Sequence, residues 1–395
     1  MWLKLVVRLL ILVSWTVLIL AGVYLGNWSE QQGAPQVLNI FTWSDLIPRA
    51  AVQEFTRQTG YRVNLSYYSN VEELLTKLQL TPQHGYDLII TSDYAVPTLI
   101  ETQQVQPLDR TQLNFWSELD PHLLNFYYDP QNRYTVPLYW DLYGIGYRTE
   151  LNLAPAQLSW QLLFAPAAEI SQSFATVVNL GAKKNRDRPR LAMLDNGLEN
   201  LLIAGQFLYP RLPAADHRPA TATAQVSALA TAAPPFTPAQ LTHLQTLLRQ
   251  QKPAVVAYTD EQAGRLLANG SVQLAATPAA LLRRVQRAGA PVKFGLPPEG
   301  GFITVEACLI AQDTTKLALV YRFLNLLYQR ELLTETVNNL GYLPVFTDLL
   351  RNLNLNDLGG YQQLFNPMIW QQLEFFQRRM TRAQASEIWV AVKAS

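Results

Sequence analysis

Two β-strand–loop–helix units in tandem near the start of the chain limit the fold more than any other feature. The strands are predicted where apolar and β-branched residues cluster, and the helices where apolar residues recur with helical spacing. In chain order these segments are the strand Leu38–Thr42, the helix Pro48–Thr59, the strand Tyr61–Tyr67, the helix Val71–Leu80 and the strand Tyr86–Thr91. Pro48 suits the first helical turn and Gly60 suits the position after the last one. This alternation predicts an α/β fold with a parallel sheet.

Polar and aromatic residues follow two of these strands directly. They are Trp43, Ser44 and Asp45 after the first strand, and Ser92, Asp93 and Tyr94 after the third. Ligands of open α/β sheets lie beyond the carboxyl ends of the strands, so these loops are expected to meet a small molecule. Plainer roles compete, because Trp43 could belong to the core, and Asp45 and Asp93 have the residue type that helix N-caps prefer.

The remainder of the chain continues the alternation of strands and helices. Predicted strands are Tyr134–Trp140, Tyr143–Arg148, Ala254–Tyr258, Val272–Ala276 and Ile303–Ala311. Predicted helices are Leu198–Tyr209, Pro238–Gln251, Glu261–Asn269, Thr315–Arg330, Leu332–Leu340 and Pro367–Val392. Two irregular stretches, 171–190 and 211–238, have few large apolar residues and are expected to be surface insertions. The basic residues of the first could touch anionic lipid or a partner, although a solvated loop is expected.

Composition argues against several classes of protein. The chain has 395 residues, which favours two cores over one. A formal net charge of +1 gives no indication of a nucleic-acid partner. No sequence motif of a hydrolase, P-loop ATPase, zinc protease or dinucleotide-binding enzyme occurs. The single cysteine, Cys308, lies in an apolar strand and is expected to be inert, and the histidines have no spacing typical of a metal site. We therefore expect no enzyme, no metal and no cofactor.

The N-terminus indicates export. Lys4 and Arg8 precede the apolar run Leu9–Leu25, and positive charge before an apolar segment directs the following chain outward. The run is longer than the usual core of a signal peptide and reaches the lower limit for a membrane span. Residues 1–26 are therefore expected to be either an uncleaved membrane anchor or a cleaved signal peptide. The main domain is expected in the periplasm or at the outer face of the cytoplasmic membrane.

The segment from Leu38 to Tyr94, with its two strand-end loops, resembles the extracytoplasmic spermidine/putrescine-binding proteins of ABC transporters. The resemblance extends from about Val37 to Pro344, with interruptions at the two irregular stretches. It implies the two-lobed periplasmic-binding-protein fold of type II, with a hinge near Trp140–Tyr143. The implied organisation has a linker at 27–36, a first lobe from 37–140 and 305–347, and a second lobe from 141–304 and 348–395. The resemblance also implies a monomer.

The resemblance assigns ligand-binding roles to eight residues. They are Trp43, Ser44, Asp45, Ser92, Tyr94, Glu199, Glu306 and Tyr342. Glu199 occupies an acidic position of the second lobe, with Asp195 or Asn196 nearby. Glu306 replaces an aspartate of the strand that returns to the first lobe. A polyamine needs such carboxylates because an unpaired buried ammonium is costly, and its methylenes and charges favour aromatic faces.

The sequence departs from the family pattern at four positions. The family's two second-lobe tryptophans fall at Pro278 and Thr304, Leu46 stands where a tyrosine is usual, and Asp141 stands where a small residue is usual. The expected ligand is therefore still cationic, but it need not be spermidine. The expected mechanism is closure of the lobes around the ligand, and delivery to an ABC permease is the expected use. A membrane-tethered sensor acting on a signalling protein is the alternative, and a ferric-ion site at the tyrosine pairs is a weaker one.

Overall fold

The computed structural model describes residues 2, 13–16, 37–81, 84–164, 190–210, 233–353, 370 and 373–395. The apolar run Leu9–Leu25 and both irregular stretches therefore lie largely outside the described residues. Within the described part of the chain, no helix has the length and apolar character needed to cross a membrane.

One mixed sheet runs through the whole molecule. Its main strands lie in the order β2-β1-β3-β10-β5-β8-β6-β7. The strands of this path are β1 (Val37–Thr42), β2 (Arg62–Tyr67), β3 (Leu88–Ser92), β5 (Thr135–Arg148), β6 (Leu191–Met193), β7 (Val255–Tyr258), β8 (Leu274–Pro278) and β10 (Gly301–Ala311). The short strands β4 (Val105–Gln106), β9 (Val292–Gly295), β11 (Leu343–Pro344) and β12 (Leu373–Phe375) pair with β5 or β10.

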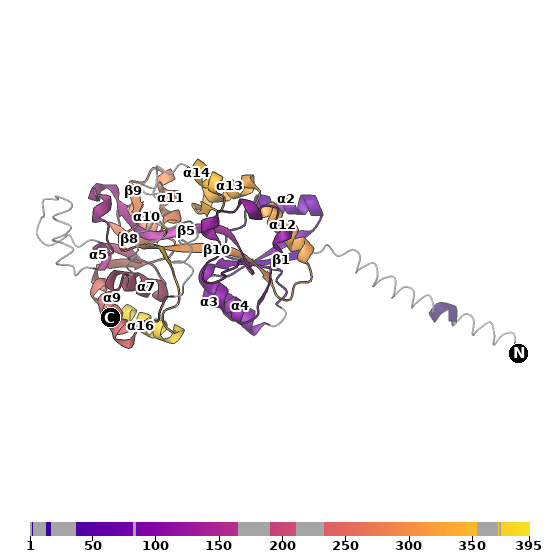
Figure 1. The fold of residues 1–395 in the computed structure, drawn as a ribbon, viewed down its shortest axis with the longest axis horizontal. Coiled ribbons are helices and arrows are strands. Elements are labelled where there is room, and N and C mark those ends of the chain that lie inside the picture. The colour runs from indigo at the N-terminus through magenta and orange to yellow at the C-terminus, as the bar shows by residue number, and fades with distance from the viewer. Residues whose placement is uncertain are drawn as a thin grey trace, which may run out of the picture.

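Helices cover both parts of this sheet. The α-helices are α2 (Arg49–Thr59), α3 (Val71–Leu80), α4 (Val96–Glu101), α5 (Gln161–Phe164), α7 (Gly197–Leu208), α9 (Pro238–Gln251), α10 (Ala263–Ala268), α11 (Ala279–Arg287), α12 (Leu317–Leu327), α13 (Arg330–Leu340), α14 (Thr347–Asn352) and α16 (Arg382–Ala394). Figure 1 shows them in two groups, with β5 and β10 running between the groups. The structure is thus the two-lobed α/β fold that the sequence indicates.

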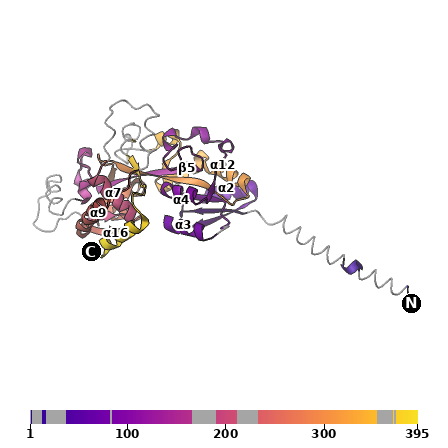
Figure 2. The ribbon, with the colours of Figure 1, turned by 60° about the horizontal axis from the view of Figure 1, so that its bottom comes forward.

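The described residues form two hydrophobic cores, and the larger one extends from one group of elements into the other. The larger core lies around β1, β3, the first half of β5 and α12, and also includes Leu267 of α10 and Leu282 of α11; the smaller lies around β6, α7, α9 and α16. Strand β5 contributes to both, since Trp140 belongs to the larger core and Ile145 to the smaller. Figure 2 shows the same strand between the lobes from another direction. A continuous strand that is buried at both ends can hold two lobes together and still bend between them.

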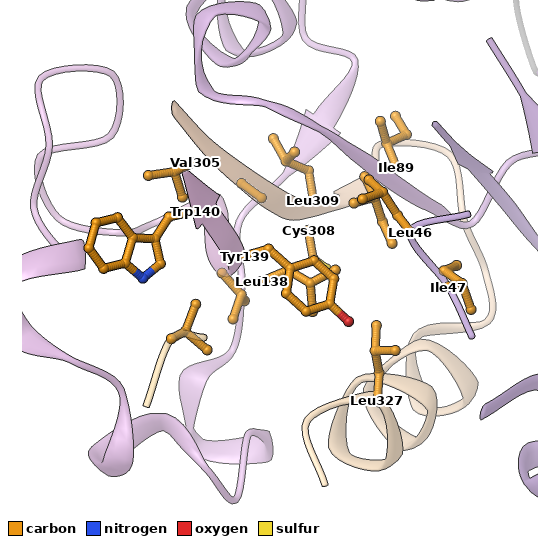
Figure 3. Packing of buried hydrophobic residues seen from close by; sticks show 14 of the residues in the cluster. Leu46, Ile47, Ile89, Leu138, Tyr139, Trp140, Val305, Cys308, Leu309 and Leu327 are labelled. Carbon is orange, nitrogen blue, oxygen red and sulfur yellow. The ribbon is translucent and has the colours of Figure 1, made fainter. Parts of the chain in front are cut away.

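The larger core explains the behaviour of the single cysteine. Figure 3 shows Cys308 on β10 among large apolar side chains that include Tyr139, Leu309 and Leu327. Burial raises the pKa of the Cys308 thiol to about 12, so the thiolate form is not populated near neutral pH. Nearby, the Trp140 indole donates its Nε1 hydrogen to the Pro344 carbonyl at 2.8 Å. This cysteine is a packing residue, as the sequence predicts.

Most predicted elements are present, with boundaries shifted by a few residues. Helices Val71–Leu80 and Pro238–Gln251 match their predictions, and Gly60 ends α2 in the left-handed conformation with φ of 73°. The predicted strands on either side of Asp141 are one strand, β5, because the intervening backbone stays in register with β10.

The prediction of one helix over Pro367–Val392 is wrong. Its described residues form the strand β12 and then, after a turn, the helix α16. Strand β12 pairs in parallel with the start of β10, from Gly301 to Ile303. The apolar residues Leu373 and Phe375 enter the larger core and Phe376 the smaller, so tertiary burial decides against the helical period. Thr381 then caps α16 by accepting a hydrogen bond from the Gln384 amide.

Candidate functional site

A cavity of about 550 Å³ lies between the two lobes. All eight residues assigned from the sequence line it: Trp43, Ser44, Asp45, Ser92, Tyr94, Glu199, Glu306 and Tyr342. They come from chain segments nearly 300 residues apart, which the sheet topology brings to one place. The volume falls within the roughly 300–1,000 Å³ typical of small-molecule sites.

Strands β5 and β10 form one wall of the cavity where they cross between the lobes. Their antiparallel pairing sets Asp141 opposite Thr304, and Tyr139 opposite Glu306. Because partners in an antiparallel pair point to the same face, as do residues two apart, Asp141 and Glu306 share one face of the sheet. Diagonal neighbours of this kind lie about 7–8 Å apart. Two carboxylates thus stand side by side on the strands that connect the lobes.

Glu306 is buried, with 5% of its surface exposed, and only one of its oxygens has a partner. The Ser92 hydroxyl donates to Oε1 at 2.6 Å, whereas Oε2 is buried without a hydrogen bond. Burial raises the pKa of Glu306 to about 7, and the Ser92 hydrogen bond opposes part of that rise. A carboxylate held in this way is oriented by the protein and lacks a partner on one side.

Asp141 has the same arrangement. Its Oδ2 accepts a hydrogen bond from the Ala280 amide at 3.0 Å, at the start of α11, and its Oδ1 is buried without a partner. Burial raises the pKa of Asp141 to about 7, against the effect of the Ala280 hydrogen bond. The nearby negative charge of Glu306 adds to the rise.

The second lobe contributes further carboxylates. Asn196 caps α7 by accepting hydrogen bonds from the amides of Leu198 and Glu199, which fixes Glu199 in the first helical turn at the cavity wall. Glu199 is 9% exposed, and burial followed by the charge of Asp260 raises its pKa well above the usual value. Asp260 itself lies at the end of β7 and has a pKa raised by burial. Both lobes therefore present acidic groups that are costly to ionise while no cation is near.

Aromatic rings accompany these acids. Trp43 lies 4.5 Å from Tyr68 between ring centroids, and its Nε1 is buried without a hydrogen-bond acceptor. Tyr342 stacks on Tyr139 with centroids 5.9 Å apart. Tyr94 and Tyr143 also line the cavity, the latter from β5. Flat rings beside carboxylates suit a ligand that carries both methylenes and positive charge.

The alternative roles of two aspartates as helix N-caps are not seen. The residue before α2 is Pro48, and Asp45 is an exposed turn residue at the cavity rim with φ of 68°. Asp93 is fully buried, and its Oδ1 accepts a hydrogen bond from the Val305 amide at 2.9 Å. Asp93 therefore ties the first lobe to β10 at the residue next to Glu306. Trp43 combines the two roles weighed for it, since it packs on the larger core and lines the cavity.

Several cavity residues were not assigned from the sequence. Tyr143, Asp260, Glu261 and Arg284 line the cavity from β5, the end of β7 and α11. The polar run after Ala254–Tyr258 was a usable signal, because it follows a strand end as the runs at Trp43 and Ser92 do. Arg284 carries no such signal, since nothing in a helical sequence tells which face meets a cleft.

The replacements at the family's tryptophan positions also lie here. Pro278 and Thr304 both line the cavity, as does Leu46. Pro278 is opposite Tyr143 in the β5–β8 pairing, and Thr304 is opposite Asp141. No group of three or more His, Cys, Asp and Glu side chains placed to hold a metal ion occurs among the described residues.

The chain is similar in sequence to known binding proteins. The chain is 22% identical over 305 residues to the spermidine/putrescine-binding periplasmic protein of Escherichia coli, covering 77% of this chain and 76% of that protein. It is 25% identical over 328 residues to the putrescine/agmatine-binding protein of Pseudomonas aeruginosa, covering 80% and 78%.

Solved structures show the same fold. The spermidine/putrescine ABC transporter substrate-binding protein of Streptococcus pneumoniae superposes with a TM-score of 0.66 at 19% identity, over 91% of this chain and 99% of that one. The model of the bacterial extracellular solute-binding protein family matches residues 50–357, more than three quarters of the chain. The chain therefore belongs to the bacterial extracellular solute-binding proteins.

Proposed function

We propose that this protein binds a small amine with at least two positive charges between its lobes and presents it to an ABC permease. One observation supports this most strongly. Buried carboxylates with unpartnered oxygens, those of Glu306 and Asp141, line the interlobe cavity, and Glu199 lines it as well. A buried acceptor without a partner costs about 1–3 kcal/mol, so a ligand that donates to it gains that free energy.

The charge balance of the cavity favours a cation over a neutral or anionic ligand. Among the described lining residues, acidic side chains come from both lobes, and Arg284 is the one basic side chain. The acids are Asp45, Asp141, Asp195, Glu199, Asp260, Glu261 and Glu306. One of them, Asp195, already has an ion pair with Lys393, outside the cavity. The others can neutralise two well-separated ammonium groups without a metal.

The relatives support the same ligand class. Two of them are described as spermidine/putrescine-binding and putrescine/agmatine-binding proteins, and we extend that class to this chain. Trp43, Tyr94, Tyr143 and Tyr342 would cover the methylenes between the charged ends. Thr304 and Pro278 offer no indole, so we expect a short amine to bind better than spermidine.

Closure would complete the site. Glu306 and Asp141 lie on the connecting strands, Trp43 and Tyr94 on the first lobe, and Glu199 on the second. We place the hinge near Trp140–Tyr143, where β5 passes from the larger core to the smaller. An amine held from both sides would favour the closed form, which a permease can distinguish from the open one. No feature of the described residues favours the tethered sensor.

A thermal-shift panel tests the ligand class. The purified chain is heated with putrescine, spermidine, neutral sugars and acidic amino acids at equal concentrations. An amine present at about 100 times its dissociation constant should stabilise the protein by close to 2.7 kcal/mol. Stabilisation by sugars or anions, with none by amines, would reject the proposal. Uptake of the amine that depends on both this protein and a permease then tests delivery.

A further inference from the structure

The two neighbouring carboxylates on β5 and β10 point to a more specific ligand. Asp141 and Glu306 share one sheet face at diagonal positions, and both are at least 95% buried. Each has one oxygen fixed by the protein, through the Ala280 amide or the Ser92 hydroxyl. Each has its second oxygen buried without a partner. One cationic head group with donors in two directions would satisfy both free oxygens at once.

We propose that Asp141 is a specificity-determining residue and that, with Glu306, it clamps a guanidinium head group. The inference rests on the proposed function, since it names the head group of the amine in that same cavity. The preferred ligand class is then an alkylamine with a guanidinium at one end and an ammonium at the other.

Burial favours guanidinium over ammonium at this position. A guanidinium has five N–H donors in a planar fork and can bond two carboxylates simultaneously, whereas an ammonium is compact and strongly hydrated. Stripping water from the head group is therefore less costly for guanidinium. Because the negative charge of Glu306 contributes to the raised pKa of Asp141, a cation between the two carboxylates removes a repulsion as well as two unpaired acceptors.

Local space favours the larger head group too. Thr304, the direct cross-strand partner of Asp141, is a small side chain that lines the cavity. A planar head group can lie in the space that a larger side chain at 304 would fill. The second lobe then provides Glu199 for the ammonium at the far end of the chain.

Asp141 also has a structural role that the test must separate from binding. Its Oδ2 bonds the Ala280 amide in the first turn of α11. Asp141→Asn keeps an oxygen for this bond and removes the charge, so the variant should fold. Thr304→Trp is a second, independent variant that leaves Asp141 intact and fills the space beside it. Asp313→Asn, an exposed acid outside the cavity, controls for net charge.

The experiment compares two ligands of the same chain length by isothermal titration calorimetry with the full chain. They are 1,4-diaminobutane and (4-aminobutyl)guanidine, which differ only in one head group. We expect the wild type to prefer the guanidine. Asp141→Asn should weaken guanidine binding roughly 10- to 100-fold, the scale of a lost hydrogen bond to a charged group, and diamine binding much less. Thr304→Trp should likewise weaken guanidine binding more than diamine binding. Asp313→Asn should leave both affinities unchanged.

The outcomes separate this inference from the function on which it rests. Equal losses for both ligands in Asp141→Asn, or no loss for either, would overturn the guanidinium clamp while leaving amine binding intact. A wild type that prefers the diamine would also overturn the guanidinium clamp and leave amine binding intact. Failure of the wild type to bind either ligand would overturn the proposed function together with the clamp.

Discussion

Replacing Glu306 with glutamine should have opposite effects on binding and on stability. Glutamine has nearly the same shape and can still accept from the Ser92 hydroxyl, but it cannot neutralise an ammonium. Removing one partner of a buried charged pair costs about 2–5 kcal/mol. Amine affinity should therefore fall by roughly 30-fold or more.

The unliganded protein should gain stability at alkaline pH from the same change. The pKa of Glu306 is about 7 in the folded protein, above its ordinary value of 4.5, so the folded state binds the proton more tightly than the unfolded state. For a group of this kind, stability is highest at low pH and is lost as the pH rises from about 4.5 through 7. The difference between the folded and unfolded pKa values corresponds to roughly 3 kcal/mol of stability that the wild type loses at alkaline pH. Glu306→Gln has no ionisable group at this position and keeps that stability.

Thermal unfolding without ligand at about pH 5 and pH 8 measures this effect. In a chain of this size 1 kcal/mol changes Tm by about 1 °C, so the Tm difference between the variant and the wild type should increase by roughly 3 °C from pH 5 to pH 8. Calorimetric titration with an amine gives the binding loss. If Glu306→Gln is less stable than the wild type at both pH values, or binds amines equally well, Glu306 is not an ionisable ligand-binding group in this cavity.

Three further predictions concern the aromatic wall, proton linkage and the lobe contact. Trp43→Ala should abolish measurable amine binding, because it removes a large ring and its cation–π contribution, and calorimetry that shows parental affinity would contradict this. Amine affinity should increase from about pH 6 to pH 8 as Asp141 and Glu306 ionise, with protons released on binding; titrations in buffers of different ionisation enthalpy measure the release, and pH-independent binding would contradict it. Gly341→Ala should destabilise the protein by about 1–3 kcal/mol in urea unfolding, because residue 341 has φ of 84° and a Cβ would collide with the Ala280 carbonyl. Gly60→Ala, with φ of 73° and open space, is its control and should cost less.

Local signals in the sequence predict the first lobe well. Helix α3 has its acidic first turn, its Asn70 cap and a consistent apolar face, so its limits follow from residues close in the chain. Strands β1 and β3 are mostly apolar and are followed by polar residues. The cavity residues Trp43 and Ser92 could be placed because strand ends of an α/β sheet meet at one edge.

What the sequence could not predict depends on contacts between distant segments. The pairing of β10 with β3, β5 and β12 decides which face of β10 meets the cavity, and therefore whether Glu306 lies in it. The sequence of β10 does not reveal that face, because all of its residues are buried and show no alternation. The strand β12 was missed because its three residues are too short for a period of two to be recognised. Arg284 lies on a helix whose orientation is fixed by packing against distant segments, mainly α10, β5 and β9.

The central claim is that carboxylates from both lobes hold one small cation. Titration calorimetry of putrescine into the wild type, Glu199→Gln, Glu306→Gln and the double variant measures it most directly, as a double-mutant cycle. We expect one ligand per chain and a clear loss of affinity in each single variant. The two losses should not be additive, because both carboxylates hold the same ligand and the loss of one contact weakens the other. Absence of binding to the wild type, or variants that bind as tightly as the wild type, would contradict the account.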